Sequence, residues 1–411
     1  MNKIVLLLGG NVLNRGIFLK CKEMGFCVFV IDWNEKPAVT GDKHYRLDIK
    51  DTQAIITQLK KDKLWDFIVF AYTSTDVAVC SVALINRELG LYQCDEKILK
   101  NALSKSVMTD KWKLSHLLNR SCWCFKEYCV EIPQLLQSKD LIIKPNASAS
   151  SRGITILDKT CTLEEIETAF YKAKEESSDK KVVVEEFVRG DEMTIEMLGD
   201  MYGNVGVYAI SLKRHSLNVD KNKIAIKLLY NCLDIKEQTR IANYAIQCYK
   251  ALGLSTSLGH LEMIRKENGE FSPVEIGARS SGFILSDLVN MVSSRDYLKD
   301  LLAVYQGGRI PNGLVKQTEQ AAMYFFYDFP SGFEIAQELN LSDFLNDRIC
   351  IWHSYRDNLK KGVITTQMDS DNTRAGFEIL QGDKQILTME YIEGIESQMY
   401  PLMLKDKNAI L

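Results

Sequence analysis

The stretch DLIIKPNASASSRGITIL, residues 140–157, decides the fold, because an apolar strand carries Lys144 into a loop of serine, glycine and arginine. Further along the chain come VVVEEFVRGDEMTIE at 182–196 and two acidic apolar runs, GHLEMI at 259–264 and FSPVEIGARSSG at 271–282. In this order the segments offer cations for phosphate groups, a backbone hinge for a purine and carboxylates for a divalent metal.

Length and charge favour a multidomain enzyme that does not bind nucleic acid. The chain has 411 residues, enough for roughly two or three domains with buried cores. Its 51 basic and 54 acidic residues give a formal net charge of -3. Because this balance lacks the basic excess typical of nucleic-acid-binding proteins, nucleic acid is not an expected partner.

The apolar run IVLLLGG at 4–10 is too short to span a bilayer, and only Lys3 precedes it where a signal peptide would carry a basic region. It is therefore expected to be a first buried strand, and no membrane partner is expected. The eleven cysteines, from Cys21 to Cys350, do not form the regular framework of a small secreted protein. We expect a cytoplasmic location.

Three cysteines lie close together, at Cys122, Cys124 and Cys129. Structural zinc sites use paired Cys or Cys/His sets with a distant second pair, which this spacing does not supply. We therefore expect these cysteines to be free thiols.

The first hundred residues predict a small doubly wound domain. Residues 3–9 read as a strand, 14–24 as a helix and 27–32 as a second strand, and this alternation predicts a parallel sheet. The glycines at 9, 10 and 16 do not fit GxGxxG, so the turn either contacts a ligand or simply joins strand to helix. Asp32 either meets a ribose hydroxyl or caps the next turn.

The rest of the chain predicts a mixture of α/β and α+β structure. A helix is expected at 104–120, and strands within 140–188 surround a helix whose Thr162 and Glu165 form a capping box. From residue 191 a larger α+β unit follows, with a long amphipathic helix over 236–252. The runs at 375–380 and 385–392 predict a terminal hairpin around Gly382 and Asp383.

Lys144 is the first candidate for binding phosphate. A lysine at the end of a buried strand can direct its ammonium group at phosphate oxygens, while the small residues after it let backbone N–H groups wrap the anion. The sequence contains no Walker A pattern, and on its own a serine-rich loop is more often an exposed turn. Lys111 and Arg152 are further cations for phosphate.

The segment VVVEEFVRGDE offers a nucleotide hinge. Backbone groups over Glu185, Glu186, Phe187 and Val188 could meet a purine edge, and Glu192 could accept hydrogen bonds from ribose hydroxyls. Taken alone, the two adjacent glutamates, Glu185 and Glu186, indicate a solvated strand end.

Glu262 and Glu275 are the candidate metal ligands. Each lies inside an apolar alternating run, where an unpaired carboxylate is costly and calls for a cation. The turn at 268–270 makes the two runs an antiparallel hairpin with both glutamates on one side. The alternative is two glutamates on the solvated face of a sheet. Arg279, just beyond, could clamp a phosphoryl or carboxylate group in a bidentate manner.

Taken together, these motifs resemble the ATP-grasp superfamily, and the N-terminal LLLGGNVLNRG, VID and TSTDVAV resemble the domain that precedes the ATP-grasp fold in its carboxylate-amine ligases. The resemblance implies a Rossmann-like domain at 1–103, a lid subdomain at 104–188 and a catalytic domain at 189–411. It implies ATP and Mg²⁺, or Mn²⁺, as cofactors. It also implies site residues, as follows. Phosphate and nucleotide ligands are Lys111, Lys144, Ser148, Ser150, Ser151, Arg152, Gly153, Glu185, Glu186, Phe187, Val188 and Glu192; metal ligands are Glu262 and Glu275; catalytic residues are Arg279, Lys144 and Glu275.

The activity that the resemblance implies is phosphorylation of a carboxylate by ATP to an acyl phosphate, followed by attack of an amine. L-amino acid ligases are the nearest relatives by this resemblance, with biotin carboxylase and carbamoyl phosphate synthetase more distant. Residues facing the small-molecule carboxylate and amine would be Arg214, His215, Lys227, Ser280, Ser281 and Gly282. Many members carry Asn where this chain has Gly277, which bears on the second metal's ligand set.

Two other functions are compatible with these motifs. A carboxylase of the purine-pathway type would need basic residues near the N-terminal glycine turn, where the sequence offers Arg15. A non-catalytic nucleotide-binding protein would bind ATP without turnover. By family analogy, a homodimer is an expected assembly.

Overall fold

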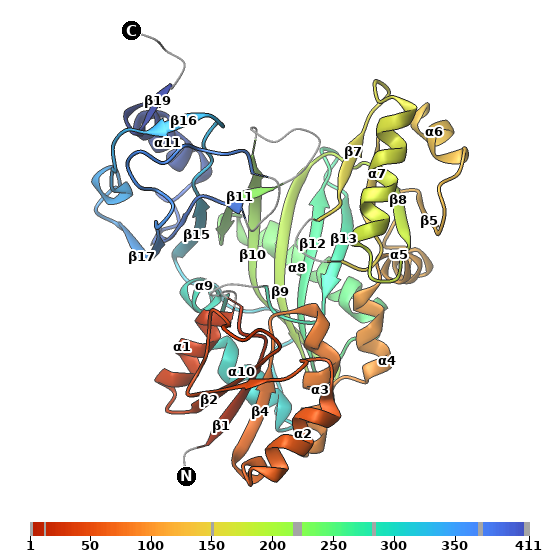
Figure 1. Ribbon diagram of the computed structural model, residues 1–411, viewed down its shortest axis with the longest axis vertical. Helices are drawn as coiled ribbons and strands as arrows, with labels where there is room; N and C mark the ends of the chain where they lie inside the picture. Colours follow the sequence, from red (N-terminus) through yellow and green to blue (C-terminus); the bar gives the residue numbers. More distant parts are fainter. Residues whose placement is uncertain are drawn as a thin grey trace.

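The computed structural model describes residues 3–11, 14–148, 152–216, 224–281, 285–368 and 373–406, without the side chains of 285 and 286. Three sheets with their helices make up most of it (Figure 1). A parallel sheet lies at the N-terminal end, a small antiparallel sheet stands to one side, and a large antiparallel sheet runs through the centre.

The N-terminal sheet has the strand order β3-β2-β1-β4, and every neighbouring pair is parallel. Its buried strands are continuous apolar runs because helices and the central sheet cover both faces. The elements are β1 (Ile4–Leu8), α1 (Arg15–Glu23), β2 (Cys27–Asp32), β3 (Lys43–Arg46), α2 (Thr52–Lys61), β4 (Ile68–Tyr72), α3 (Val79–Glu88) and the short α4 (Glu96–Leu99). The doubly wound opening predicted from the sequence is therefore confirmed.

Asp32 closes the glycine turn that follows β1. The Gly10 N–H donates to Asp32 Oδ2 at 2.7 Å, and Oδ1 accepts from the Asn34 backbone and side chain at 2.7 and 2.8 Å. Gly9 has φ +96°, a conformation that favours glycine. Of the two alternatives for Asp32, the turn cap is the one observed here.

The small sheet has the order β5-β8-β6-β7 and is antiparallel throughout. Its elements are α5 (Lys105–Leu114), β5 (Cys122–Phe125), α6 (Glu131–Leu136), β6 (Leu141–Pro145), β7 (Thr155–Leu157), α7 (Leu163–Glu176) and β8 (Val182–Glu186). The capping box of Thr162 and Glu165 starts α7 as predicted. The apolar face of α7, with Ile166 and Phe170, packs on the sheet.

The large sheet has the order β13-β12-β9-β10-β11-β15-β18-β17, and β14 pairs with β10. Its strands are β9 (Asp191–Gly199), β10 (Val205–His215), β11 (Ala225–Tyr230), β12 (Leu258–Arg265), β13 (Phe271–Gly277), β14 (Gly313–Leu314), β15 (Gln320–Phe326), β17 (Ile349–Tyr355) and β18 (Phe377–Asp383). The helices that accompany it are α8 (Ile235–Ala251), α9 (Leu285–Val292), α10 (Tyr297–Tyr305) and α11 (Met389–Met403). A two-stranded ribbon, β16 (Phe333–Ile335) with β19 (Leu404–Asp406), lies beside α11.

The prediction of a terminal hairpin is wrong in its second half. β18 pairs with β15 and β17, and the segment after it becomes α11, whose N-cap Thr388 accepts from the Tyr391 N–H. The apolar residues after Met389 recur at helical spacing, and Ile392, Ile395 and Met399 are buried in the C-terminal core. A short window over 385–392 showed only local alternation, whereas the buried stripe extends to Met403.

Over the ranges that the structure describes, no helix is both long and apolar enough to cross a membrane. All eleven cysteines lie in these ranges and are free thiols.

Candidate functional site

One face of the large sheet carries a row of carboxylates across three adjacent strands. Glu262 on β12 pairs in register with Glu275 on β13, and β9 next to them carries Glu192 and Glu196. Residues directly opposite each other in an antiparallel pair point to the same side. The hairpin that was predicted to bring Glu262 and Glu275 together is therefore present, and their side chains are 24% and 31% exposed.

Two lysines balance these carboxylates. The Lys213 Nζ on β10 lies 2.9 Å from both Glu192 Oε1 and Glu262 Oε1. The Lys105 Nζ on α5 lies 2.8 Å from Glu275 Oε2 and donates to the Ser148 carbonyl at 3.2 Å. Burial alone would raise the pKa of Glu262, but Lys213 and His260 together lower that pKa to about 2. Glu262 is therefore ionised at neutral pH.

His260 joins two of these carboxylates. Its Nδ1 lies 2.6 Å from Oε1 of the fully buried Glu196, and its Nε2 lies 3.6 Å from Glu262 Oε1. Burial would lower the pKa of His260, but Glu196 and Glu262 raise it to about 9. His260 is thus an imidazolium at neutral pH. His215, on the same face, places Nε2 3.3 Å from Glu192 Oε2.

A second ionic cluster lies where the small sheet meets the large one. Lys144 Nζ is 2.6 Å from Glu185 Oε2, and the Arg120 guanidinium contacts the same oxygen at 3.1 Å. All three side chains are buried, and Arg120 also donates to Ser272 Oγ and the Pro273 carbonyl on β13. Burial would raise the pKa of Glu185, but Arg120 and Lys144 lower it to about 2. The reading of Glu185 as a solvated strand end is therefore wrong.

Around this second cluster, the loop and hinge residues are held by local contacts. Ser148 has a buried hydroxyl, Arg152 Nη1 lies 3.3 Å from Glu176 Oε2, and Gly153 has φ +68°. Glu186 is paired with Lys139 at 2.9 Å. In the hinge, the N–H groups of Glu186 and Phe187 donate to the Ser121 and Asp140 carbonyls, and Val188 is half-buried. Ser150, Ser151 and Gly282 lie outside the described residues.

Arg279 is tied to the N-terminal sheet. Its Nε and Nη2 donate to the two oxygens of Asp76 at 2.9 and 2.8 Å, and Nη1 donates to the Ser280 carbonyl at 2.9 Å. The Ser280 hydroxyl bonds with that of Tyr72, and Ser281, the next residue, is half-buried. Arg279 therefore lies two residues beyond the end of β13, against the loop after β4.

Three predicted residues are not brought to the carboxylate row. Arg214 and Lys227 oppose each other across β10 and β11, and their partners are the α11 residues Glu393, at 3.7 Å, and Glu396, at 2.6 Å. Their register places them on the opposite face from Lys213. Lys111 is half-buried on α5, six residues after the buried Lys105, so the two do not share a helix face.

Some site residues escaped the sequence analysis. Glu196, Thr194 and Glu192 alternate along β9, and His260 precedes Glu262 by two residues, so a strand periodicity of two could have indicated both Glu196 and His260. Lys213 has the same relation to His215. No comparable local pattern marks Lys105, Asp76 or Arg120, because only the folded chain brings them to their partners.

The carboxylate row has the chemistry that a hard divalent cation needs. Within the described ranges, no three or more His, Cys, Asp or Glu side chains are grouped so as to hold a metal ion. Two carboxylates on adjacent strands nevertheless match Mg²⁺, which takes one or two protein carboxylates and completes its shell with phosphate oxygens and water. The residues present therefore fit a metal that arrives with a nucleotide.

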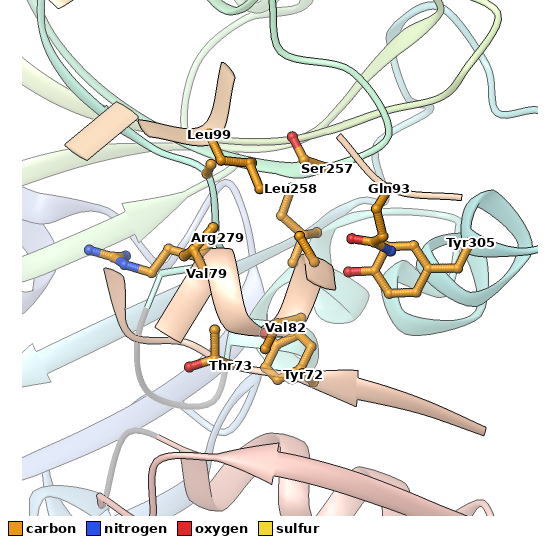
Figure 2. A pocket seen from close by; sticks show the side chains of 12 residues that line it. Tyr72, Thr73, Val79, Val82, Gln93, Leu99, Ser257, Leu258, Arg279 and Tyr305 are labelled. Carbon is orange, nitrogen blue, oxygen red and sulfur yellow. The ribbon is translucent and has the colours of Figure 1, made fainter. Parts of the chain in front are cut away.

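A small pocket lies between the N-terminal sheet and the end of the hairpin (Figure 2). Tyr72 and Val82 line one side, Leu258 and Arg279 another, and Tyr305 from α10 a third. The Arg279 guanidinium points away from Tyr305 in this view. Neither Glu262 nor Glu275 lines this pocket, so it is separate from the carboxylate row.

Comparison with known proteins relates this geometry to a family. Residues 137–287 match the model of the ATP-grasp domain. The alanine–anticapsin ligase of Bacillus subtilis is 22% identical over 273 residues, which cover 60% of this chain and 56% of that protein. The matches to curated relatives span only about half of the relatives' own length.

Solved structures agree over nearly the whole chain. An L-amino acid ligase from Bacillus licheniformis has a TM-score of 0.72 at 18% identity, covering 99% of each chain. The biotin carboxylase domain of a Hydrogenobacter thermophilus 2-oxoglutarate carboxylase, solved with magnesium ADP and bicarbonate, has a TM-score of 0.67 at 15% identity, covering 98% of this chain and 91% of that one. At these identities the likeness establishes the fold. Residues 137–287 therefore match an ATP-grasp domain, and the chain as a whole has the fold of these solved structures.

Proposed function

We propose that this protein is an ATP-dependent carboxylate-amine ligase that releases ADP and phosphate. The observation that carries the proposal is the in-register pair Glu262 and Glu275, on one face and next to Lys213 and Lys105. This arrangement supports a magnesium nucleotide lying on the large sheet beneath the loop that starts at Ser148. The names of the similar ligases and the solved nucleotide complex support the same reading.

Each part of the site has a role in this proposal. Glu262 and Glu275 would hold Mg²⁺, which when bound neutralises phosphate charge and orients the transferred group. Glu192 would accept from the ribose, and Lys144 and the loop would meet the phosphates. Arg279 would steady the oxygens of the phosphoryl group as they move to the substrate carboxylate. The amine would then displace phosphate from the acyl phosphate and form the amide.

Larger features of the protein belong to the proposal as well. The domain limits are those implied by the resemblance, at 103 and 188, and the three sheets fall on either side of them. The substrates are a small carboxylate and a small amine, the assembly is a homodimer, and the location is the cytoplasm.

One observation favours the ligase over a carboxylase of the purine-pathway type. A phosphorylated ribosyl substrate would need free N–H groups and cations at the N-terminal glycine turn. The Gly10 N–H is already engaged by the Asp32 carboxylate, which itself would repel a phosphate. The N-terminal glycine turn is therefore already bound by the Asp32 carboxylate.

The test is an ATP-turnover screen with pooled carboxylates and pooled amines, followed by product mass. ADP formation that requires both pools, with a product lighter by one water than the sum of the substrates, is the expected result. With hydroxylamine in place of the amines, a hydroxamate should accumulate, because hydroxylamine traps acyl phosphates. ADP formation that depends on bicarbonate would favour the carboxylase, and nucleotide binding without turnover in any pool would favour a non-catalytic protein.

A further inference from the structure

The ion pair between Arg279 and Asp76 links two separate sheets at the candidate site. Asp76 follows β4 of the N-terminal sheet, and Arg279 follows β13 of the large sheet, 203 residues later. The contact is bidentate, which fixes the plane of the guanidinium as well as its position. The two side chains are only 23% and 15% exposed.

Because residue 277 is glycine and has no side chain, it leaves room for the Asp76–Arg279 pair. A Cβ at position 277 would lie 3.3 Å from Asp76 Oδ1 and 3.3 Å from Arg279 Cγ, tighter than nearly all such contacts. A side chain there would require Asp76 or Arg279 to move by a few tenths of an ångström. Many ATP-grasp proteins carry Asn at this position. In this chain the position is glycine, and the Asp76 carboxylate lies where a side chain would begin.

A second contact ties the same two segments together. The hydroxyl groups of Tyr72, the last residue of β4, and Ser280 are hydrogen-bonded in the interior. Among the described residues, Asp76 and the Ser280 carbonyl use three of the five N–H groups of Arg279, which leaves two for a ligand oxygen. Arg279 is therefore directed by the N-terminal sheet and still able to bind an anion.

We propose that Asp76 is a positioning residue, which holds Arg279 in the orientation required to bind the transferred phosphoryl group. This inference rests on the proposed function. Its physical reason is that a guanidinium without a fixed partner samples many rotamers, whereas transition-state binding needs donors already in place. A purely structural role is a weaker explanation, since a buried ion pair adds little net stability over well-packed neutral residues.

The test uses Asp76→Asn, which keeps the size of the side chain and removes its charge. Binding of Mg-ADP, and of Mg-ADP with vanadate as a mimic of the phosphoryl group in transfer, is measured by calorimetry. We expect the variant to bind Mg-ADP within about 2-fold of the wild type and the vanadate complex at least about 10-fold more weakly, the loss of one oriented charged donor. Asp76→Glu should recover part of this loss. The matched control is Asp42→Asn, which breaks a pair with Lys22 on the same N-terminal sheet.

A second set of variants separates positioning from stability. Gly277→Ala should weaken the vanadate complex in the same direction, because the added Cβ requires Asp76 or Arg279 to shift by a few tenths of an ångström. The double variant Asp76→Arg, Arg279→Asp exchanges the two charges. It should be more thermally stable than Asp76→Ala, but it should not regain affinity for the vanadate complex. Equal vanadate affinity in wild type and Asp76→Asn would overturn the inference alone. A wild-type protein that binds no Mg-ADP would instead overturn the proposed function on which the inference rests.

Discussion

The two ionic clusters of this protein carry opposite excess charge. At the small sheet, Lys144 and Arg120 surround one carboxylate, Glu185, so two positive charges and one negative leave +1. At the large sheet, counting only the residues that the structure describes, four glutamates, at 192, 196, 262 and 275, meet two lysines and the imidazolium of His260, so three positive formal charges and four negative leave -1 among them. The first excess suits an anion and the second a cation.

The two clusters also differ in how far their side chains are buried. The three side chains of the small-sheet cluster are at most 4% exposed, whereas Glu262 and Glu275 remain 24% and 31% exposed. A closed cluster holds the fold together, and a half-open one can exchange a lysine contact for a metal. In the proposed function the closed cluster supports the fold and holds the lysine that meets phosphate, whereas the half-open cluster holds the metal. Each of the following changes tests this contrast.

The largest effect is expected for Glu275→Gln. The amide keeps the shape of the side chain but cannot supply the charge that a magnesium ion requires, so turnover should fall by about 10³-fold or more. ADP formation in the substrate screen measures this, with circular dichroism to show an intact fold. Glu270→Gln, at the tip of the same hairpin, is the matched control. Near-normal ADP formation by Glu275→Gln would contradict the assignment of the metal site.

In the small-sheet cluster the main effect should be on stability. Glu185→Leu leaves the buried Lys144 and Arg120 without their common partner, which should lower the free energy of unfolding by about 3–5 kcal/mol. Urea denaturation followed by circular dichroism measures the change. The neighbouring Glu186→Gln, which breaks a more exposed pair with Lys139, should cost at most about 1 kcal/mol. Similar losses for both variants would remove the distinction between the two glutamates.

The pH dependence of stability should differ between the clusters on the alkaline side. The pKa of His260 is raised from 6.5 to about 9 in the folded protein, so its contribution is complete below pH 6.5 and is lost as pH rises through about 9. Glu185 and Glu262, both lowered from 4.5 to about 2, contribute above pH 4.5 and lose that contribution as pH falls through about 2. Urea midpoints from pH 6 to 10 should therefore fall less steeply in His260→Gln than in the wild type. An unchanged slope would show that His260 is not charged in the fold.

The smallest effect is expected for Arg214. Its ion pairs are at 3.7 and 3.9 Å, it is 39% exposed, and it lies on the sheet face opposite Lys213. Arg214→Gln should therefore leave ADP formation within about 2-fold of wild type, as for most exposed ion pairs. His215→Asn, beside Glu192, should instead raise the KM for ATP by about 3- to 10-fold, since it removes ground-state binding. A larger effect from Arg214 than from His215 would reverse the assignment of the two faces.

Much of the fold was accessible from the sequence, because its strands and helices have strong local patterns. The βαβ opening, the capping box at Thr162 and the hairpin of β12 and β13 all appear as predicted. The segment around Met389 was predicted wrongly because its short apolar run fits both the strand period of two and the helix period of about 3.6 residues. Only packing in the C-terminal core selects the helix.

Some residues of the candidate site could be predicted from the sequence, and others could not. Glu262 and Glu275 could be paired from sequence, because a short turn fixes the register of a hairpin. Lys105 and Asp76 could not be found, because their partners lie far along the chain and no local pattern encodes those contacts. Arg214 and His215 are adjacent in sequence but lie on opposite sheet faces, which the strand periodicity alone could have indicated.

The sequence by itself determined where most strands and helices would form and which of their faces would be apolar, since both follow from the spacing of side chains along the backbone. The tertiary structure decided which charges meet. It buried Glu185 between Lys144 and Arg120, set Lys213 between two glutamates, and brought Asp76 to Arg279 across the space left by Gly277. Those contacts join separate sheets, and electrostatic pairing at a few ångströms depends on how whole sheets pack rather than on any local run of residues.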